Sequence, residues 1–577
     1  MKYIILSIVL LSVFVSLNLA QNGIDYCVPL YASLMFYKAQ RAGKLPDNDV
    51  PWRADSVLND GQDLGIDLSG GYFDAGDYIK FTFPLAYVMT TLGWSYVQFQ
   101  DNIVNKCHLQ DEYLSVLKYG TDWIMNAHYD ANHLVTQVDV MNSHSAWNKP
   151  SDIDYKRTLF TVDNTQKCTD VAMQSASALA MASLAFASTN PTYSTQLLTK
   201  AKSLYTLGKN CPAGTMVVPD TSQGYSSSGY QDEQIWASIC MYLATGRSTS
   251  TTYYSDLTGS LQALQGRAFN DIWSVVISWD SKYSAAAMMA FKSLSSDPNL
   301  SQFSSSLQSL ANAIVTTWSN QDKFTNGIVS SKDGWQWGNN RYSMGGAFLA
   351  AVMNSTDSNN WAKQQVNCVL GQCPSNSKSY VIGYGNNYAL FPHHRAAHNP
   401  VPQTSGGQLT INYPVATTYT LLGALIGGPS IQNPSYTDTR DNYIQNEPAI
   451  DYNAGFTGAL AGLVNFEHTG GYNGNPTSTT SSQSTTSTTS SQSTTTTTTS
   501  KPTTTSSTTS SQSTSSTTTT AHQSTSSTTS HLTTNGEEPT EDPTISSGYL
   551  LKSSFIFVLL TFVFIKTKIS KIVLGVN

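Results

Sequence analysis

Charged residues are scarce in this sequence, and basic residues are the scarcer kind. Lysine and arginine together number 31 among 577 residues, against 38 aspartate and glutamate residues, so the formal net charge is -7. No run of basic residues occurs between residues 22 and 467. A protein that binds nucleic acid needs a positively charged surface to meet the phosphates. We therefore expect no nucleic-acid partner for this chain.

Cysteine is also sparse, and its spacing excludes the common zinc sites. The chain has seven cysteines and contains no Cys-x-x-Cys pair, so we expect no structural zinc site. An odd number leaves at least one cysteine free or paired with another molecule. Cys368 and Cys373 are close enough in sequence to be partners, but the sequence leaves the pairing open.

Alternation of apolar and polar residues, which predicts half-buried strands, is rare in the first 470 residues. Apolar residues recur there at helical spacing instead. The segments with this pattern are residues 113–128, 171–186, 234–245, 284–294, 303–318, 344–353 and 454–466. Loops rich in glycine, asparagine and serine separate them. The pattern predicts an all-α domain of about 440 residues, with helices packed in pairs and functional residues on the loops.

The N-terminus has the pattern of a secretion signal. Lys2 precedes an apolar run over residues 3–15, and Ala20 is a small residue at a cleavage-like position. We predict a signal peptide over residues 1–20, with Gln21 as the first residue of the mature protein; a buried N-terminal helix is the alternative. Secretion favours disulfide bonds. It also agrees with two glycosylation sequons, Asn299-Leu300-Ser301 and Asn354-Ser355-Thr356.

The composition changes sharply near residue 470, where the predicted large domain (residues 21–470) ends. Residues 471–536 are nearly all serine and threonine, with too few apolar side chains to offset the entropy of ordering. They predict a disordered, O-glycosylated stalk. An acidic spacer (residues 537–548), a hydrophobic segment (residues 549–565) and a basic tail (residues 566–577) follow.

The hydrophobic segment predicts a membrane anchor. Its length is at the short edge of the roughly 17 to 25 residues that a spanning helix needs. Lys566, Lys568 and Lys571 follow it, which places the large domain outside the cell. Ser546-Ser547-Gly548 leaves open a lipid-anchor signal whose tail is removed. Both interpretations put the domain on the cell surface, and a fully secreted protein is the third alternative.

The stretch GGYFDAGDYIKF (residues 70–81) is the first that carries chemistry. Asp74 and Asp77 lie three residues apart among glycine and aromatic residues. Glycine lets a backbone approach a ligand closely, and aromatic rings stack on sugar rings. A hydrogen-bonded turn or a helix cap is the plain alternative. The spacing lacks the series of oxygen ligands of an EF-hand calcium loop.

A second acidic stretch, residues 436–456, combines carboxylates, tyrosines and amides ahead of an apolar helix. Between the two stretches lies Pro392-His393-His394-Arg395. Taken alone, the two histidines would be ordinary surface residues. Taken together, the three stretches supply paired acids, cationic or hydrogen-bonding partners and rings that stack, as a site for a neutral polar ligand such as carbohydrate requires.

Several longer motifs, in their order, resemble glycoside hydrolase family 9, a family of endo-β-1,4-glucanases (cellulases). They are WRADS (residues 52–56), DLSGGYFDAGDYIKF (residues 67–81), SGYQDE (residues 228–233), SWD (residues 278–280), WGNNRY (residues 337–342) and the His393 and Glu447 stretches. The resemblance spans the whole large domain. It implies an (α/α)6 barrel with an open cleft, inversion at the anomeric carbon, no required cofactor and a monomeric enzyme. The layout of a large domain followed by a serine- and threonine-rich stalk also resembles the cellulases of social amoebae.

The resemblance also implies roles for individual residues. Asp77 matches the general base, Asp74 the residue that helps hold the attacking water, and Glu447 the general acid. His393 and Asp438 match further signature residues of the catalytic site. The positions that match substrate-binding residues are His144, Trp147, Trp279, Trp337, Arg341, Arg395 and Tyr452. Ser228, Gly229, Asp232 and Glu233 resemble a structural calcium site seen in part of the family.

The expected reaction places requirements on the positions and protonation states of the two acids. An inverting glycosidase separates its two carboxyl groups by about 6.5 to 9.5 Å to admit a water molecule. Asp77 must be ionised while Glu447 holds a proton, which predicts a bell-shaped dependence of activity on pH. Pro448 departs from the family pattern and could re-aim Glu447. Asp139-Val140 departs from it too, in a loop expected to face substrate.

Two other functions stay open at this point. A non-catalytic glycan-binding or wall-structuring protein could keep the same cleft, although it could lose either acid without losing its aromatic rings. An enzyme could also act on chitosan or a mixed-linkage glucan, because every β-1,4-linked glycan offers similar ring faces.

Overall fold

The computed structural model describes residues 24–46, 50–140, 144, 146–218, 224–330 and 337–464. The predicted signal peptide, stalk, acidic spacer, hydrophobic segment and basic tail lie outside these residues. Within the described part of the chain, no helix has the length and apolar character that crossing a membrane requires.

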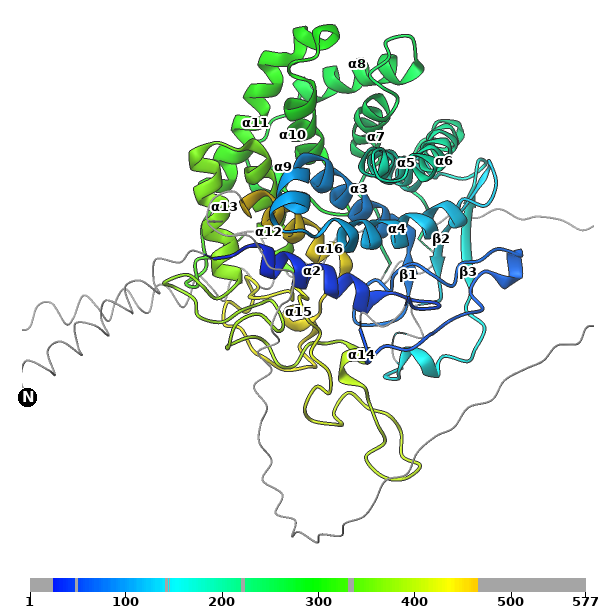
Figure 1. The fold of residues 1–577 in the computed structure, drawn as a ribbon, viewed down its shortest axis with the longest axis vertical. Helices are drawn as coiled ribbons and strands as arrows, with labels where there is room; N and C mark the ends of the chain where they lie inside the picture. Colours follow the sequence, from blue (N-terminus) through cyan, green and yellow to red (C-terminus); the bar gives the residue numbers. More distant parts are fainter. Residues whose placement is uncertain are drawn as a thin grey trace, which may run out of the picture. The chain divides into compact units, whose positions relative to one another are not determined.

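Helices dominate the described residues, and twelve of them have 12 to 20 residues (Figure 1). In chain order they are α2 (Cys27–Gln40), α3 (Thr82–Gln98), α4 (Gln110–Ala127), α5 (Thr169–Phe186), α6 (Pro191–Asn210), α7 (Gln231–Ala244), α8 (Thr252–Gln265), α10 (Tyr283–Leu294), α11 (Ser304–Ser319), α12 (Asn339–Met353), α13 (Thr356–Val369) and α16 (Ile450–Leu463). The seven helical segments predicted from sequence fall in α4, α5, α7, α10, α11, α12 and α16, so those predictions are confirmed.

Six of these helices form a closed ring of contacts. Helix α3 packs on α5, α5 on α7, α7 on α10, α10 on α12, α12 on α16, and α16 returns to α3. Each also packs on an outer helix: α3 on α4, α5 on α6, α7 on α8, α10 on α11, α12 on α13, and α16 on α2. Some outer helices reach a second inner helix, as α4 does with α5 and α13 with α16. The predicted packing in pairs is therefore confirmed.

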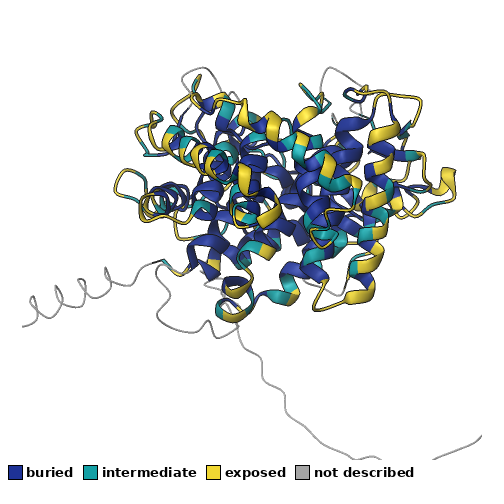
Figure 2. Cartoon of the chain, turned by 90° about the horizontal axis from the view of Figure 1, so that it is seen from above, coloured by how far each residue is buried: buried dark blue, intermediate teal, exposed yellow. Residues whose placement is uncertain are grey.

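Inner and outer helices differ in composition, because they differ in burial. Every residue of α16 is buried, and its sequence is small or apolar almost all round, as a helix enclosed by others requires. Outer helix α8 buries only Leu257, Leu261 and Leu264, a single stripe at helical spacing. Figure 2 shows this contrast as a buried centre with exposed surfaces around it. The inner helices can approach closely: a Cβ atom on Gly455 of α16 would lie 2.7 Å from Gly345 Cα of α12.

A small antiparallel sheet, which the sequence pattern did not predict, supports one side of the domain. Its order is β1 (Lys80–Phe81), β2 (His133–Val138) and β3 (Leu159–Asp163). Lys80 pairs with Val138 and Phe81 with Gln137. This pairing anchors the C-terminal end of the Asp74–Asp77 loop directly before α3 begins.

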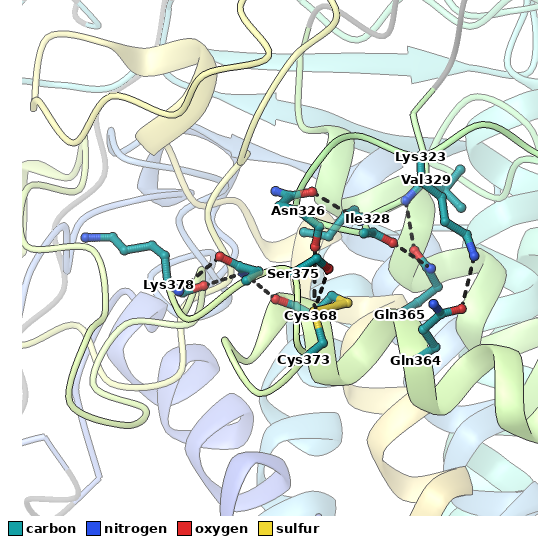
Figure 3. The surroundings of a disulfide bond; sticks show 12 residues. Lys323, Asn326, Ile328, Val329, Gln364, Gln365, Cys368, Cys373, Ser375 and Lys378 are labelled. Carbon is teal, nitrogen blue, oxygen red and sulfur yellow. Dashed lines mark hydrogen bonds between the residues drawn. A yellow bond between two sulfur atoms is a disulfide. The ribbon is translucent and has the colours of Figure 1, made fainter.

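Three disulfide bonds join Cys27 to Cys107, Cys168 to Cys211 and Cys368 to Cys373, and Cys240 is buried as a free thiol. Figure 3 shows the surroundings of the third bond. Nearby, Gln365 of α13 accepts a hydrogen bond from Val329 N at 2.9 Å and donates one to Gly327 O at 3.1 Å. The side chains of α13 thus fasten the turn that leads toward Trp337.

The remaining short helices lie in the connections. They are η1 (Gln62–Leu64), η2 (Asn102–Lys106), η4 (Pro150–Asp152), α9 (Ile272–Val275), η5 (Pro298–Phe303), α14 (Arg395–His398) and α15 (Tyr443–Asn446). Helices α14 and α15 matter for function, because α14 carries Arg395 and α15 ends immediately before Glu447.

Candidate active site

The loops that precede the inner helices line one cavity of about 920 Å³. Asp74 and Asp77 precede α3, Trp279 precedes α10, and Glu447 precedes α16. The lining residues are Asp74, Ala75, Asp77, Phe81, His144, Trp147, Gly224, Tyr225, Trp279, Trp337, Arg341, His393, Arg395, Leu409, Thr410, Ile411, Tyr443, Glu447, Ala449 and Tyr452. The cavity therefore collects every predicted catalytic and substrate-binding residue except Asp438.

Gly76 lets the two acidic stretches meet. Its N–H donates to Glu447 Oε1 at 3.3 Å, and its carbonyl accepts from Arg395 N at 3.0 Å. A Cβ atom at this position would lie 2.0 Å from His393 O, so only glycine fits. One residue thus joins the Asp74–Asp77 loop, the His393 stretch and Glu447.

Asp77 is held in its ionised form. His144 Nδ1 lies 2.5 Å from Asp77 Oδ2, and Ile79 N donates to Asp77 Oδ1 at 3.4 Å. Burial raises the pKa of Asp77, but the His144 hydrogen bond, the His144 charge and the Arg395 charge outweigh it, so the net pKa is lowered. The same hydrogen bond raises the pKa of His144. The pair therefore favours the carboxylate form of Asp77 and the imidazolium form of His144.

Asp74 has the opposite environment three residues away. Burial, followed by the negative charge of Asp451, raises its pKa well above the usual value. Tyr225 donates a hydrogen bond to Asp74 Oδ2. The other oxygen, Oδ1, is buried and finds no hydrogen-bond partner among the described residues. Because a buried polar atom without a partner is costly, Oδ1 is a ready acceptor or donor for a bound water molecule.

Glu447 is a cavity carboxyl group whose pKa lies near neutrality. Burial and then the negative charge of Asp77 raise its pKa to about 7. Its backbone has φ of -77° and ψ of 131°, which is the extended region that a residue before proline favours. Pro448 therefore agrees with the backbone geometry of Glu447 in this structure.

His393 and Arg395 line the same cavity as the two acids. Burial lowers the pKa of His393 to about 4, so this imidazole is neutral at ordinary pH, and its Nδ1 lies 2.8 Å from Arg440 O. Arg395 donates to Ala146 O at 2.8 Å, and its guanidinium lies 4.7 Å from the centre of the Trp147 ring. Its Nη1 is buried without a partner in the described part of the chain and remains available to a ligand.

Asp438 does not line the cavity, so the structure does not place it with the other predicted catalytic residues. It accepts hydrogen bonds from Leu390 N at 2.9 Å and Phe391 N at 3.1 Å, and it pairs with Lys378 at 3.1 Å. These bonds fix the segment that leads into His393. The Asp438 carboxylate therefore holds the backbone in place. Resemblance to a family motif cannot by itself distinguish such a structural residue from a catalytic one.

Replacing Asp438 by alanine is expected to lower the free energy of unfolding by about 2 to 4 kcal/mol, because two backbone N–H groups and an ammonium lose their acceptor. Urea unfolding measures this effect. The folded variant should keep far more activity than Asp77→Asn. A fully stable variant that has lost activity as severely as Asp77→Asn would contradict the anchoring role.

Aromatic side chains line much of the rest of the cavity. Trp337 and Tyr443 are 43% and 45% exposed, with ring centres 5.1 Å apart, so they offer a wide open face. Trp279 meets Tyr225 edge to face at 4.8 Å. Sequence reasoning missed Tyr225, Tyr443 and Phe81 as lining residues. Tyr443 stands inside the second acidic stretch and could have been found there, whereas Tyr225 lies in a serine- and glycine-rich loop that gives no such signal.

The side chain of Arg341 is held in place by an ion pair with Asp451. Its Nη1 lies 2.7 Å from Asp451 Oδ2, and its guanidinium lies 5.2 Å from the centre of the Tyr452 ring. The ion pair holds the cation at the edge of the cavity in one orientation.

The departure from the family pattern at Asp139 lies away from the cavity. Asp139 has φ of 83°, a conformation that favours glycine. Its buried carboxylate accepts from Arg157 Nε at 3.0 Å, and this ion pair stabilises the unusual residue.

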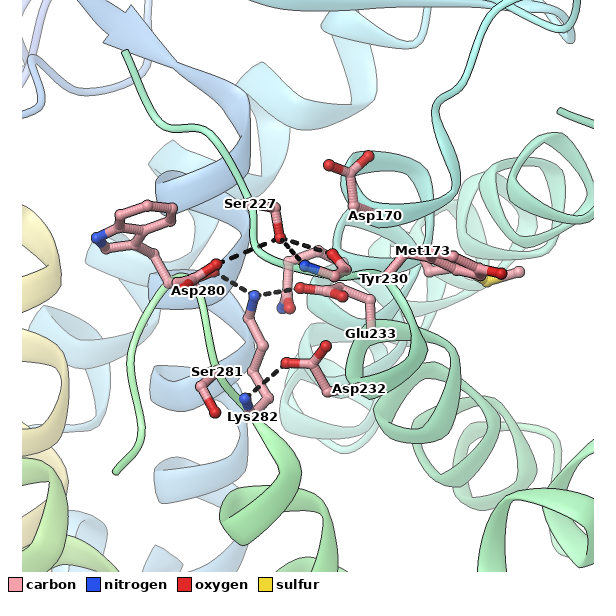
Figure 4. Close-up of polar contacts among 12 residues, drawn as sticks. Asp170, Met173, Ser227, Tyr230, Asp232, Glu233, Asp280, Ser281 and Lys282 are labelled. Carbon is pink, nitrogen blue, oxygen red and sulfur yellow. Dashed lines mark hydrogen bonds and ion pairs between the residues drawn. The ribbon is translucent and has the colours of Figure 1, made fainter. Parts of the chain in front are cut away.

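The predicted calcium residues come together at the start of α7, but they do not present a calcium shell. Ca²⁺ takes about 6 to 8 oxygen ligands. Lys282 donates from its ammonium to Glu233 Oε1 and from its backbone N–H to Asp232 Oδ2 at 2.8 Å; Figure 4 shows Lys282 pointing into this cluster. Within the described ranges, no group of three or more His, Cys, Asp or Glu residues is arranged to hold a metal ion. Ser228 and Gly229 have no acidic side chain and could bind a cation only through neutral oxygens such as backbone carbonyls. Gly229 O accepts a hydrogen bond from Ser227 Oγ at 2.6 Å.

The family model that matches this chain is glycosyl hydrolase family 9, over residues 26–460. The chain belongs to this family. An endoglucanase of Dictyostelium discoideum is 40% identical over 478 residues, which cover 79% of this chain and 64% of that protein. Endoglucanase 10 of Arabidopsis thaliana is 33% identical over 482 residues, which cover 77% of this chain and 88% of that protein. The chain thus spans less than two thirds of the length of the Dictyostelium relative.

Solved structures show the same fold. An endoglucanase of the termite Nasutitermes takasagoensis matches with a TM-score of 0.67 and 34% identity, covering 77% of this chain and 99% of that chain. A cellulase of C. cellulolyticum in complex with cellobiose matches with a TM-score of 0.67 and 29% identity, with the same coverage.

Proposed function

We propose that this family 9 protein hydrolyses internal β-1,4-glucosidic bonds of cellulose or related β-glucans, with inversion at the anomeric carbon. The observation that carries the proposal is a pair of carboxyl groups in one cavity with opposite pKa shifts. The pKa of Asp77 is lowered and that of Glu447 is raised to about 7. A base that is ionised and an acid that is protonated at the same pH are what single-step hydrolysis needs.

In this mechanism Asp77 accepts a proton from a water molecule as the water attacks the anomeric carbon. Asp74 Oδ1, which is buried without a partner among the described residues, holds the same water in line. Glu447 transfers its proton to the glycosidic oxygen, so that the leaving sugar departs as a neutral alcohol. His144 stabilises the Asp77 carboxylate before proton transfer. No covalent bond to the protein forms.

The walls of the cavity suit a glucan chain. Trp279 and Trp337 offer ring faces to sugar rings. The more deeply buried rings of Trp147 and Tyr452 line the same cavity beside the guanidinium groups of Arg395 and Arg341. Arg395 and Arg341 offer hydrogen-bond donors to sugar hydroxyl groups. A glycan-binding protein without catalytic activity would need the aromatic rings. It would not need two acids whose pKa values are shifted in opposite directions, so the site favours the enzyme over the glycan-binding alternative.

The organisation of the whole chain is part of the same proposal. We propose that the closed ring of paired helices is an (α/α)6 barrel, that the enzyme is monomeric and needs no cofactor, and that residues 21–470 are its catalytic domain. The predicted signal peptide, stalk and C-terminal hydrophobic segment would export the domain and tether it to the cell surface. Protease release of activity from intact cells would test the tether.

The experiment that tests the function is cleavage of soluble carboxymethyl-cellulose by the purified full chain. Release of reducing ends together with a rapid fall in viscosity is expected, because an endo-acting enzyme cuts internal bonds. Proton NMR should show the α-anomer as the first product. If the folded protein cleaves no β-1,4-glucan, mixed-linkage glucan or chitosan but binds insoluble cellulose, the glycan-binding function replaces this one.

Activity should be highest at mildly acidic pH and fall above neutrality. Asp77 must be ionised, and its pKa lies below the usual aspartate value; Glu447 must be protonated, and its pKa is about 7. As pH rises through about 7, the acid loses its proton and kcat/KM should fall about tenfold per pH unit. Initial rates on a soluble cello-oligosaccharide across the acidic, neutral and alkaline ranges measure the profile.

His144→Asn is the matched variant for this profile. It removes a hydrogen bond and a positive charge that lower the pKa of Asp77, and a charge that also lowers the pKa of Glu447. Both limbs of the profile should therefore move to higher pH. If the folded variant has the same acidic and alkaline limbs of the pH profile as the wild type, groups other than Asp77 and Glu447 control the profile.

A further inference from the structure

A buried ion pair lies behind the substrate cavity, outside the catalytic groups. Lys282, at the start of α10, and Glu233, in the first turn of α7, both have fully buried side chains. The Lys282 ammonium donates to Glu233 Oε1 and to the carbonyl oxygen of Trp279. It also lies 4.4 Å from the centre of the Phe83 ring. The ammonium is thus surrounded by an anion, a carbonyl and an aromatic face.

This arrangement connects two loops that carry cavity residues. The backbone N–H of Lys282 donates to Asp232 Oδ2 at 2.8 Å. Asp280, two residues earlier, accepts from Ser228 N at 2.6 Å. Figure 4 shows the segment before α7 and the segment before α10 in contact here. The first segment leads from Tyr225, and the second contains Trp279.

The Trp279 ring connects this cluster to the surroundings of Asp74 through its ring contacts. Its ring meets Phe83 at 6.2 Å and Tyr225 at 4.8 Å, both edge to face. Tyr225 in turn donates to Asp74. A shift of the Trp279 carbonyl would therefore move a ring that lines the cavity and disturb the packing beside a catalytic carboxyl group.

Burying an ammonium is costly unless its donors are satisfied and its charge is paired. Such pairs add little net stability but select one geometry, because any other geometry leaves a buried charge unpaired. Asp232 and Glu233 are adjacent buried acids. Burial raises the pKa of Glu233, and the positive charge of Lys282 acts against that rise, so the ammonium favours the carboxylate form. The chain thus supplies a cation for these acids from its own Lys282.

We propose that the Lys282 ammonium is a built-in cation that holds the Trp279 loop against α7, so that the Trp279 ring keeps its position in the substrate cavity without a metal ion. Lys282 is then a positioning residue that acts through Trp279. The proposal rests on the proposed function, because it assigns Trp279 to the binding of a glucan chain.

The first test uses the wild-type full chain with calcium chloride or EDTA. The Tm and the KM for cellotetraose are expected to be the same in both. A lower Tm in EDTA that calcium restores would overturn the proposal, because a metal ion would then hold the loop. The Tm measurement needs no activity, so a protein that is inactive on every glucan refutes the proposed function without deciding this one.

The second test is a double-mutant cycle with Lys282→Met and Trp279→Ala. Methionine keeps the unbranched shape and removes the charge. Lys282→Met should raise KM about tenfold while kcat changes less than about threefold, since one ring contact of about 1.4 kcal/mol is lost. In the Trp279→Ala background it should add nothing further. Lys292→Met, on the exposed side of the same helix, is the control and should leave KM unchanged.

Two results of the cycle would overturn the proposal: an unchanged KM in folded Lys282→Met, or a full additional increase in the Trp279→Ala background. Glu233→Gln replaces Lys282→Met in the same cycle if the latter does not fold. Glu233→Gln keeps the shape of the side chain and one hydrogen-bond acceptor, but it leaves the Lys282 ammonium without its counter-charge. We expect KM to rise less than in Lys282→Met, and again to rise no further in the Trp279→Ala background.

Discussion

Glu447→Gln and Asp77→Asn should each reduce kcat on carboxymethyl-cellulose by about 10³- to 10⁴-fold, because each removes one partner of a concerted proton transfer. Both replacements keep the size of the side chain. Gly76 N donates to Oε1 of Glu447, and the amide in Glu447→Gln retains one oxygen that can accept the same bond, so the loop contact survives. Asp111→Asn on the exposed start of α4 is the matched control and should retain full activity.

The two variants should differ on an activated substrate. An aryl cellobioside with an acidic phenol leaves without protonation, so Glu447→Gln should recover most of its activity there. Asp77→Asn should not recover, because water still needs a base. The same recovery in both variants would contradict the division of roles, and full activity of either folded variant on cellulose would exclude that residue from catalysis.

Asp74→Asn should reduce kcat by about 10²-fold. Asp74 Oδ1 is buried without a partner among the described residues, and in the proposed mechanism it holds the attacking water. In Asp74→Asn, the amide nitrogen can only donate a hydrogen bond to the water, whereas the carboxyl oxygen that it replaces can also accept one. The measurement is kcat on cellotetraose at saturating concentration, with KM expected to change little.

Tyr225→Phe separates the water contact from the support of Asp74. It removes only the hydroxyl that donates to Asp74 Oδ2 and keeps the ring that packs on Trp279. Its effect on kcat should be about tenfold or less. If Tyr225→Phe loses as much activity as Asp74→Asn, the main role of Asp74 is to pair with the tyrosine, and the water-holding role fails.

Helices were predictable where one face of the helix is polar or where small apolar residues cluster. Helix α3 was missed, because nearly all of its residues are buried and no polar face reveals its period. Helix α8 was missed for the opposite reason, since only three of its residues are buried. The short sheet was missed because β1 has only two residues.

The site was predictable as a set of residues but not as an arrangement. Motif resemblance named both acids, yet it could not separate Asp438, which holds backbone, from groups that face the cavity. It named Asp232 and Glu233 as calcium ligands, and that remains a prediction. The contacts of Lys282 with both residues emerge only when α7 and α10 are packed together. Tyr225 belongs to none of the motifs. Its place in the cavity becomes visible only in the folded structure, where it donates a hydrogen bond to Asp74.

The sequence by itself determined the helical character of the domain, the family and the identity of the acidic residues, since these depend on residue type and order. The tertiary structure decided how the acids differ. Asp77 and Glu447 carry the same functional group, and their pKa values are shifted in opposite directions because one is paired with His144 while the other is buried beside a negative charge. Those environments come from loops at opposite ends of the helical domain's sequence, which only folding brings together.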